Sequence, residues 1–175
     1  MPDTGKTVQS QTSLRDASHL PDAEEVKAFM DEAIREAING MEEGGIPIGS
    51  VLVRKGKIIG RGHNRRIQFG DPTAHAEIDC LRAAGRLRSY KDTILISTLM
   101  PCAMCAGATV QFGIPIVIAG ENRTFASSSE FMQVNGVHIV DLNLDECYEM
   151  LAQFAKEHPS LWSEDIGVEP SYEPQ

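Results

Sequence analysis

Residues 93–119 read TILISTLMPCAMCAGATVQFGIPIVIA, and their pattern sets the architecture of the chain. Residues 93–98 are rich in β-branched side chains and predict a strand, and Pro101 then opens a segment that predicts a helix to about Phe112. Residues 116–119 are again apolar and predict a second strand. Because a strand, a helix and a strand in succession are typical of parallel strands joined by a crossover, we expect a largely parallel sheet.

The flanking sequence adds a hairpin before this unit and further helices around it. Apolar residues recur at helical spacing from Val26 to Met41. Asp22 with Glu25 resembles a capping box, and Gly44-Gly45 ends the pattern. The other expected elements are hairpin strands at 46–53 and 58–63, a helix at 73–84 opened by Asp71-Pro72, a short helix near 128–134, a strand at 137–140 and a helix at 144–157. Together they predict an α/β fold, a three-layer α/β/α sandwich around a mixed five-stranded sheet.

The length of 175 residues suits one domain with a single core. We expect a flexible arm at 1–21, one domain at 22–167 and a polar tail at 168–175. Hydrophobic residues at 42% and charged residues at 23% exclude collagen-like and disordered classes. The start has no signal-peptide pattern, and no apolar run reaches the roughly 18 residues of a membrane span. We therefore expect a cytoplasmic protein with reduced cysteines and no membrane partner.

Two short motifs carry the chemistry, and each stands at the expected start of a helix. They are Pro101-Cys102-Ala103-Met104-Cys105 and His75-Ala76-Glu77. Cysteines three residues apart lie on one side of a helix, and the positive end of the helix dipole favours the thiolates that bind metal. With His75, Cys102 and Cys105 make a set of one nitrogen and two sulfurs. This set suits Zn²⁺ with water as the fourth ligand, as in catalytic zinc sites.

Glu77 is the expected proton carrier beside this zinc. Zinc would lower the pKa of a water molecule, and Glu77, which is not a ligand, would accept its proton and pass it on. His75 and Glu77 would diverge by roughly 200° around an ideal helix, so we expect the metal beyond the helix end. The alternatives are a redox pair of the two cysteines and a structural zinc site completed by Cys80, Cys147 or His63.

These motifs resemble the signature of the zinc-dependent cytidine and deoxycytidylate deaminase superfamily. Within it the chain is most similar to fungal-type cytosine deaminases. The stretches that carry this resemblance are GGIPIG at 44–49, GRGHN at 60–64, ENRTF at 121–125 and WSEDIG at 162–167. The resemblance implies a zinc-dependent hydrolytic deaminase of a free pyrimidine base, cytosine or isocytosine, that serves nucleobase salvage. It also implies a homodimer, with the helix that begins at Pro101 as an interface element.

The resemblance further assigns residues to the substrate pocket. The Asn64 amide and the Ala76 backbone N–H would face the carbonyl edge of the base, and Asp165 would accept from its exocyclic amine. The apolar walls would be Ile48, Phe125 and Trp162, with residues 162–167 closing over the base. Simpler explanations exist for three of them: Asn64 as a turn residue, Asp165 as a solvated carboxylate of the tail, and Trp162 as a core residue.

The chain departs from the fungal-type pattern at two positions. Met100 stands where a small residue is usual, and Ser163 stands where an aromatic residue is usual. Both positions would border the pocket and change which ring fits. The resemblance therefore leaves cytosine and isocytosine open, and it disfavours creatinine-like and purine rings.

Two rival functions remain. A deaminase of tRNA or polynucleotides would use the same zinc chemistry on a flipped base, and a purine-base deaminase would use it on a free purine. The net charge of −9 argues against phosphate contacts, although residues 54–91 hold ten basic and three acidic residues. We interpret the basic residues as helix-end and turn residues, and we expect 162–167 to obstruct a nucleotide backbone. The other rival, a zinc-stabilised interaction module without turnover, needs a filled fourth ligand position.

Overall fold

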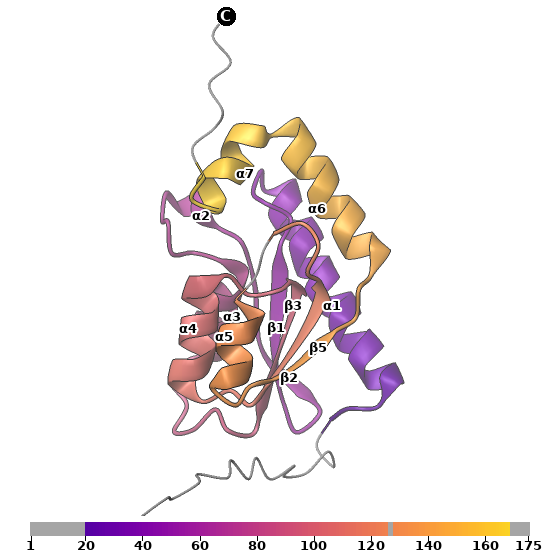
Figure 1. Cartoon of the computed structure of the whole chain (residues 1–175), viewed down its shortest axis with the longest axis vertical. Helices are drawn as coiled ribbons and strands as arrows, with labels where there is room; N and C mark the ends of the chain where they lie inside the picture. Colours follow the sequence, from indigo (N-terminus) through magenta and orange to yellow (C-terminus); the bar gives the residue numbers. More distant parts are fainter. Residues whose placement is uncertain (1–19, 126–127, 169–175) are drawn as a thin grey trace, which may run out of the picture.

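The computed structural model of the chain describes residues 20–125 and 128–168 (Figure 1). A five-stranded sheet forms its centre, in the order β2-β1-β3-β4-β5. The strands are β1 (Gly49–Arg54), β2 (Lys57–His63), β3 (Thr93–Leu99), β4 (Ile116–Glu121) and β5 (His138–Asp141). β1 is antiparallel to both of its neighbours, whereas β3, β4 and β5 are parallel. Four strands therefore run in one direction and β1 runs in the other, so the predicted mixed sheet is confirmed.

Helices cover both faces of this sheet, which confirms the predicted three layers (Figure 1). One face carries α1 (Ala23–Glu42) and α6 (Asp145–Glu157), and the other carries α3 (Ala76–Ala84), α4 (Ala103–Phe112) and α5 (Ser129–Val134). Successive residues of β3 point to opposite faces. Leu95 packs in the cluster beneath α3 to α5, while Ile96 packs in the cluster beneath α1. The capping box of Asp22 and Glu25 at the start of α1 is present as predicted.

Two glycines of β2 bring α3 directly onto the strand. A Cβ atom at Gly60 would lie 2.5 Å from the Cys80 carbonyl oxygen, and one at Gly62 would lie 2.3 Å from the Cys80 nitrogen. No side chain fits into that space. The GRGH sequence therefore lets the first turn of α3 lie beside the end of β2.

The boundary of α3 differs from the prediction, because the helix begins at Ala76 and not at Thr73. The Asp71 carboxylate accepts the backbone N–H of Thr73 at 2.8 Å and its hydroxyl at 2.7 Å. This local bonding offers the backbone a turn in place of a helix, so Asp71 does not cap α3. His75 takes the cap position, with an extended backbone at φ −70° and ψ 160°.

Two short helices occur where the sequence predicted none. α2 (Arg66–Phe69) lies within the expected loop 64–70, and α7 (Pro159–Asp165) forms most of the closing segment. They lie close together beyond one edge of the sheet (Figure 1). Most of the predicted arm at 1–21 and most of the predicted tail at 168–175 lie outside the described residues.

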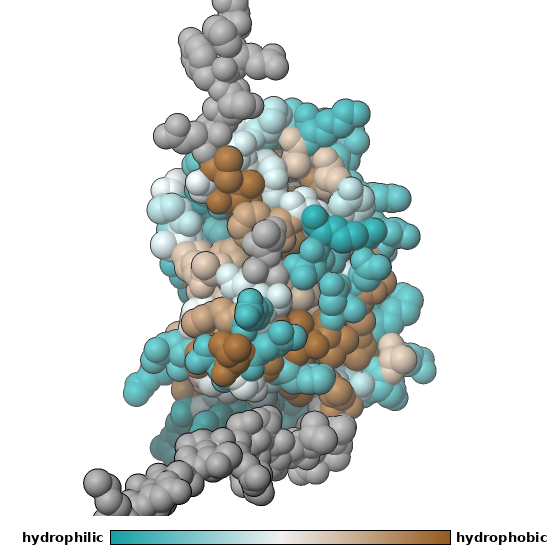
Figure 2. Space-filling view, viewed as in Figure 1, coloured by the Kyte–Doolittle hydropathy of each residue, from teal (hydrophilic) through white to brown (hydrophobic). Residues whose placement is uncertain are grey.

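The surface is mainly hydrophilic in the view of Figure 2. Apolar side chains form separate groups there, one of them over the end of α7. Among the helices of the described ranges, none has the length and apolar character needed to cross a lipid bilayer.

Candidate metal centre and substrate pocket

The candidate site lies where the parallel strands end. Asn64 follows β2, Met100 follows β3 and Phe125 follows β4, while α3 and α4 begin at the same edge. In α/β sheets the carboxyl ends of parallel strands and the amino ends of the following helices form a crevice. Segments far apart in the sequence are therefore brought to one place.

Three potential metal ligands meet in this crevice. His75 caps α3, Cys102 caps α4, and Cys105 lies in the first turn of α4. One donor atom from each residue lies within 4.8 Å of the other two, and the Cys102 Sγ is 3.6 Å from the His75 Nδ1. Both capping residues have an extended backbone, so their side chains project beyond the helix ends. The two helix starts thus face one another across the donor atoms, as the sequence predicted.

The donor set fits zinc. Hydrogen bonds from the Cys105 thiol and the His75 ring lower the pKa of Cys102 to about 4. The hydrogen bond with Cys102, together with burial, raises the pKa of Cys105 well above its usual value. Burial lowers the pKa of His75, but Cys102, Asp165 and Glu77 outweigh it and raise the pKa overall. The pair thus carries one thiolate before any metal binds, and a metal would displace the second proton.

No fourth His, Cys, Asp or Glu joins these donors within 20–125 and 128–168. Cys80 and Cys147 are buried in separate core clusters on opposite faces of the sheet, where desolvation raises the pKa of each thiol. His63 lies between Glu36 and Glu43, with one ring nitrogen 3.1 Å from each carboxylate. The candidate fourth ligands of a structural site therefore lie elsewhere. Three protein ligands with an open position are typical of catalytic zinc.

Glu77 lies beside the donor atoms in the first turn of α3. Its side chain is buried, and its Oε2 lies 3.4 Å from the Cys105 Sγ. Burial, followed by the Cys102 thiolate, raises the pKa of Glu77 to about 7. A bound divalent cation would favour the ionised form and counter this rise. A buried carboxyl that changes its protonation state near neutrality is suited to general acid and base catalysis.

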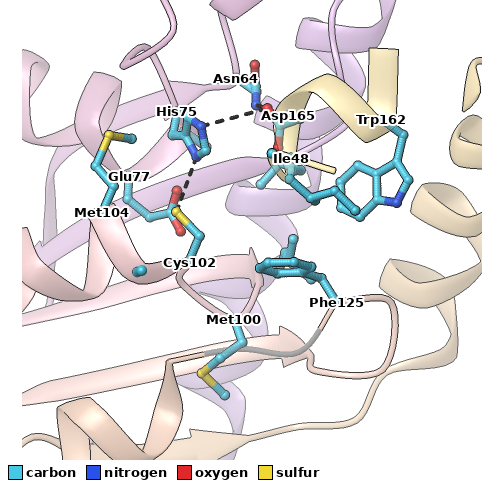
Figure 3. Close-up of a pocket in the computed structure, with 15 residues that line it drawn as sticks. Ile48, Asn64, His75, Glu77, Met100, Cys102, Met104, Phe125, Trp162 and Asp165 are labelled. Carbon is cyan, nitrogen blue, oxygen red and sulfur yellow. Dashed lines mark hydrogen bonds and ion pairs between the residues drawn. The ribbon is translucent and has the colours of Figure 1, made fainter. Parts of the chain in front are cut away.

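A cavity of about 290 Å³ opens beside the three ligands (Figure 3). Ten of the eleven predicted site residues line it, and Cys105 is the exception. The lining also includes residues without a predicted role: Leu99, Ala103, Met104, Ile166 and Gly167. Phe125 meets Trp162 edge-on, with 6.4 Å between the ring centroids. Trp162 packs in the apolar cluster with Ile48, so it is both a core residue and a pocket wall.

Asp165 is buried at the cavity and is not a solvated carboxylate of the tail. Its side chain is 4% exposed. Its Oδ1 accepts the Asn64 amide at 2.9 Å and the Arg66 guanidinium at 3.1 Å, and it lies 3.8 Å from the His75 Nε2. α7 therefore delivers a carboxylate to the same cavity as the metal ligands.

The two departures from the fungal-type pattern differ in their place, because Met100 borders the cavity as expected and Ser163 does not. Met100 lines it, but its side chain packs in the core cluster with Ala106 and Met132 and points away from the cavity in Figure 3. Leu99 belongs to the cluster beside the cavity, and the next residue along an extended chain points the other way. Ser163 is absent from the lining within the described ranges. Met100 thus presents its main chain to the cavity.

Half of the basic residues at 54–91 are paired with acidic residues. Among them, Arg66 is the arginine next to the site, because it forms ion pairs with Glu164 and Asp165 of α7. The other paired residues are Arg54, Arg61, Arg65 and Arg82. The sequence indicates turn and helix-end residues in this segment and gives no direct sign of a role for Arg66 in the site. The signal in the sequence that could have linked Arg66 to the site is its position two residues after Asn64.

Comparisons with known proteins agree with this geometry. The family described as "Cytidine and deoxycytidylate deaminase zinc-binding region" matches residues 23–121. A cytosine deaminase of Candida albicans is 42% identical over 144 residues, which are 81% of this chain and 96% of that protein. A tRNA-specific adenosine deaminase of Streptococcus pyogenes is 40% identical over 116 residues, which are 63% of this chain and 72% of that protein.

A solved structure from a study of A-to-I editing by tRNA:A34 deaminases has a TM-score of 0.62 to this chain. It is 33% identical and covers 71% of this chain and 99% of its own. The chain belongs to the cytidine and deoxycytidylate deaminase family and is a zinc-binding hydrolase of C–N bonds.

Proposed function

We propose that this deaminase acts on a free pyrimidine base, cytosine or isocytosine, and releases uracil and ammonia. The observation that carries the proposal is the small cavity roofed by Trp162 and Asp165 of α7. At about 290 Å³ it is at the lower limit of ligand pockets, which suits a single ring. The similarity to a cytosine deaminase along 81% of the chain supports the same substrate class.

The polar groups of the cavity match a ring with a carbonyl and an amine. The Ala76 backbone N–H, in the first turn of α3, has no acceptor among the described residues. The Asn64 amide uses one N–H for Asp165 and has a second available. Acceptors are the Asp165 carboxylate and the Met100 carbonyl, which receives no hydrogen bond in the described part of the chain. Donors and acceptors on different elements would hold the two edges of one base.

Apolar side chains complete the cavity. Ile48, Phe125 and Trp162 form walls that would lie against the faces of a flat ring. A ribose or phosphate group attached to the base would need space that α7 occupies. The proposal therefore excludes nucleosides and tRNA as good substrates.

Glu77 is the proposed acid and base. Zinc held by His75, Cys102 and Cys105 would supply a Lewis acid that makes water a nucleophile at neutral pH. Glu77 accepts a proton from the attacking water and gives it to the ring nitrogen. It then carries the second proton to the amine, so that ammonia leaves and the carbonyl of the product forms. Burial keeps bulk water from competing for these protons.

A homodimer is part of the same proposal. α4 exposes Met104 and Phe112, which are 36% and 45% accessible, and α5 beside it exposes Phe131 at 46%. A second copy of the chain on this face would remove these apolar side chains from water. Sedimentation equilibrium should give twice the chain mass of 19.1 kDa. A Phe112→Glu variant should be monomeric, and a monomeric native protein would refute the dimer.

The substrate is tested by an ammonia-release screen of the zinc-loaded protein. The candidates are cytosine, isocytosine, cytidine, guanine and an adenosine-containing tRNA anticodon stem-loop. We expect turnover of a pyrimidine base, weak or no turnover of cytidine, and none with Glu77→Gln. Turnover of cytidine equal to that of the free bases would refute a closed pocket, and turnover of the stem-loop alone would favour a tRNA substrate.

A further inference from the structure

We infer that Arg66 is a positioning residue that fixes Asp165, and through it α7, over the cavity. The role of Asp165 in holding the base rests on the proposed function. The fixation of α7 does not, because it follows from contacts within the chain. Arg66 is outside the set of described residues that line the cavity, so it acts through Asp165.

The guanidinium of Arg66 contacts the carboxylates of two consecutive residues of α7. The Arg66 Nη1 donates to the Asp165 Oδ1 at 3.1 Å, and the Nη2 lies 3.3 Å from the Glu164 Oε1. The side chains of Arg66 and Asp165 are 11% and 4% exposed, whereas that of Glu164 is 70% exposed. Water and salt screen the outer pair but hardly reach the inner one. The contact with Asp165 is therefore the stronger of the two.

Asn64 closes a ring of hydrogen bonds around the same carboxylate. Its Oδ1 accepts the backbone N–H of Arg66 at 3.1 Å, and its amide donates to the Asp165 Oδ1 at 2.9 Å. Two donors thus hold Oδ1, while Oδ2 accepts nothing from the described residues. This arrangement fixes the rotation of the carboxylate and leaves one oxygen for a ligand.

Packing alone does not account for this arrangement. The Arg66 Nε is buried and has no hydrogen-bond partner among the described residues. Burying a charged group with an unpaired N–H opposes folding, because the group loses its water. The favourable free energy that offsets this loss comes from the carboxylates that the other guanidinium nitrogens contact.

α7 depends on such anchors because it is only seven residues long. A helix of this length is not stable by its own hydrogen bonds. Its attachments to the pocket region include the apolar packing of Leu161 and Trp162 and the hydrogen bonds to Asp165 and Glu164. Removing the guanidinium would leave Asp165 with one donor, and both the carboxylate and the short helix would gain freedom.

Trp162 provides a readout that needs no substrate. It is the single tryptophan of the chain and is 9% exposed, so tryptophan fluorescence reports on α7 alone. In zinc-loaded Arg66→Gln, we expect the acrylamide quenching constant to rise by about threefold because α7 opens more often. Arg65→Gln is the matched control, since this neighbouring arginine pairs with Glu43 and Asp79 and not with α7. It should quench like the native protein.

Kinetics with the base that the screen identifies provide the second readout. Arg66→Gln should raise KM by about 10- to 100-fold, the range for a lost charged hydrogen bond, while kcat per bound zinc stays within about threefold. Arg66→Lys keeps one charged donor and should recover part of the loss. The double variant with Asp165→Asn should be no worse than Asp165→Asn alone, because Arg66 acts through Asp165.

Arg66→Gln with the quenching and KM of Arg65→Gln would overturn the inference. A fall in kcat per zinc with unchanged KM and quenching would also overturn it, because that pattern indicates a general structural role. If the native protein deaminates no free base, the proposed function fails, and the quenching comparison still decides whether Arg66 holds α7. Should Arg66→Gln not fold, Arg66→Lys replaces it, with smaller changes expected in the same directions.

Discussion

Replacing Glu77 by glutamine should abolish turnover and yet stabilise the zinc-free protein at neutral pH. Glutamine has nearly the same shape, but it cannot take a proton from water and return it. Positioned acid and base groups contribute about 10²- to 10⁴-fold to a rate, so kcat should fall at least this far. Zinc content should remain complete because Glu77 is outside the set of donor atoms.

The stabilisation follows from the burial of the carboxyl. Its pKa is raised from 4.5 to about 7 in the folded protein. A raised pKa favours the folded state below the unfolded value, and this contribution disappears as the pH rises through the folded value. The free energy of unfolding of the native protein should therefore fall, relative to Glu77→Gln, by about 2 to 3 kcal/mol between pH 5 and pH 8.

Urea denaturation of both zinc-free proteins at several pH values measures this difference. Other titrating groups act on both proteins and largely cancel in the comparison. Glu42→Gln, which changes an exposed carboxyl on α1, should show no such pH-dependent difference. A constant difference between pH 5 and pH 8 would show that Glu77 is not desolvated. Normal turnover by fully zinc-loaded Glu77→Gln would refute its catalytic role.

Four further perturbations test the metal centre, two glycine positions and the pocket floor. Zinc binding near pH 7 should release at least one proton, that of Cys105, because the pKa of Cys102 is lowered and that of Cys105 is raised. The protonated fraction of His75, whose pKa is raised, adds to this release, and affinity should weaken as the pH falls. Calorimetric heats that do not depend on the ionisation enthalpy of the buffer would contradict this. Gly62→Ala should destabilise the protein by about 3 kcal/mol, because the new Cβ would overlap the backbone of α3. In contrast, Gly107→Ala, which meets nothing within 4 Å in α4, should stabilise it by up to about 1 kcal/mol in thermal melts. Met100→Ser should lower stability by about 2 to 4 kcal/mol through a core cavity, and a KM changed by more than about threefold would contradict the orientation of its side chain.

The sheet and the metal centre could be predicted because their signals are local. Alternating apolar runs specify strands, and a cysteine pair after a proline specifies ligands at a helix start. The donor atoms of His75, Cys102 and Cys105 meet as the two motifs implied. The three ligands could be expected to meet without knowing exact distances, because the parallel strands bring the starts of both helices to the same edge of the sheet.

The short helices and the orientation of Met100 could not be predicted in the same way. α2 and α7 span four and seven residues, so neither shows a helical repeat, and tertiary contacts decide their conformation. Asp71 followed by Pro72 fits a helix cap, but the bonds from Asp71 to Thr73 form a turn there. Met100 follows the last residue of β3. A shift of one residue along the strand decides whether a side chain there points into the cavity or into the core.

The net charge is the feature that the structure reinterprets most. A positive balance at 54–91 raised the prospect of a phosphate-binding face. Five of its arginines instead pair with carboxylates inside or outside this segment, and Arg66 contacts Glu164 and Asp165. Under the proposed function, α7 supplies both the wall and the carboxylate that recognises the amine. A substrate larger than a base would displace α7 and lose that carboxylate, so selection by size and selection by hydrogen bonding depend on the same seven residues.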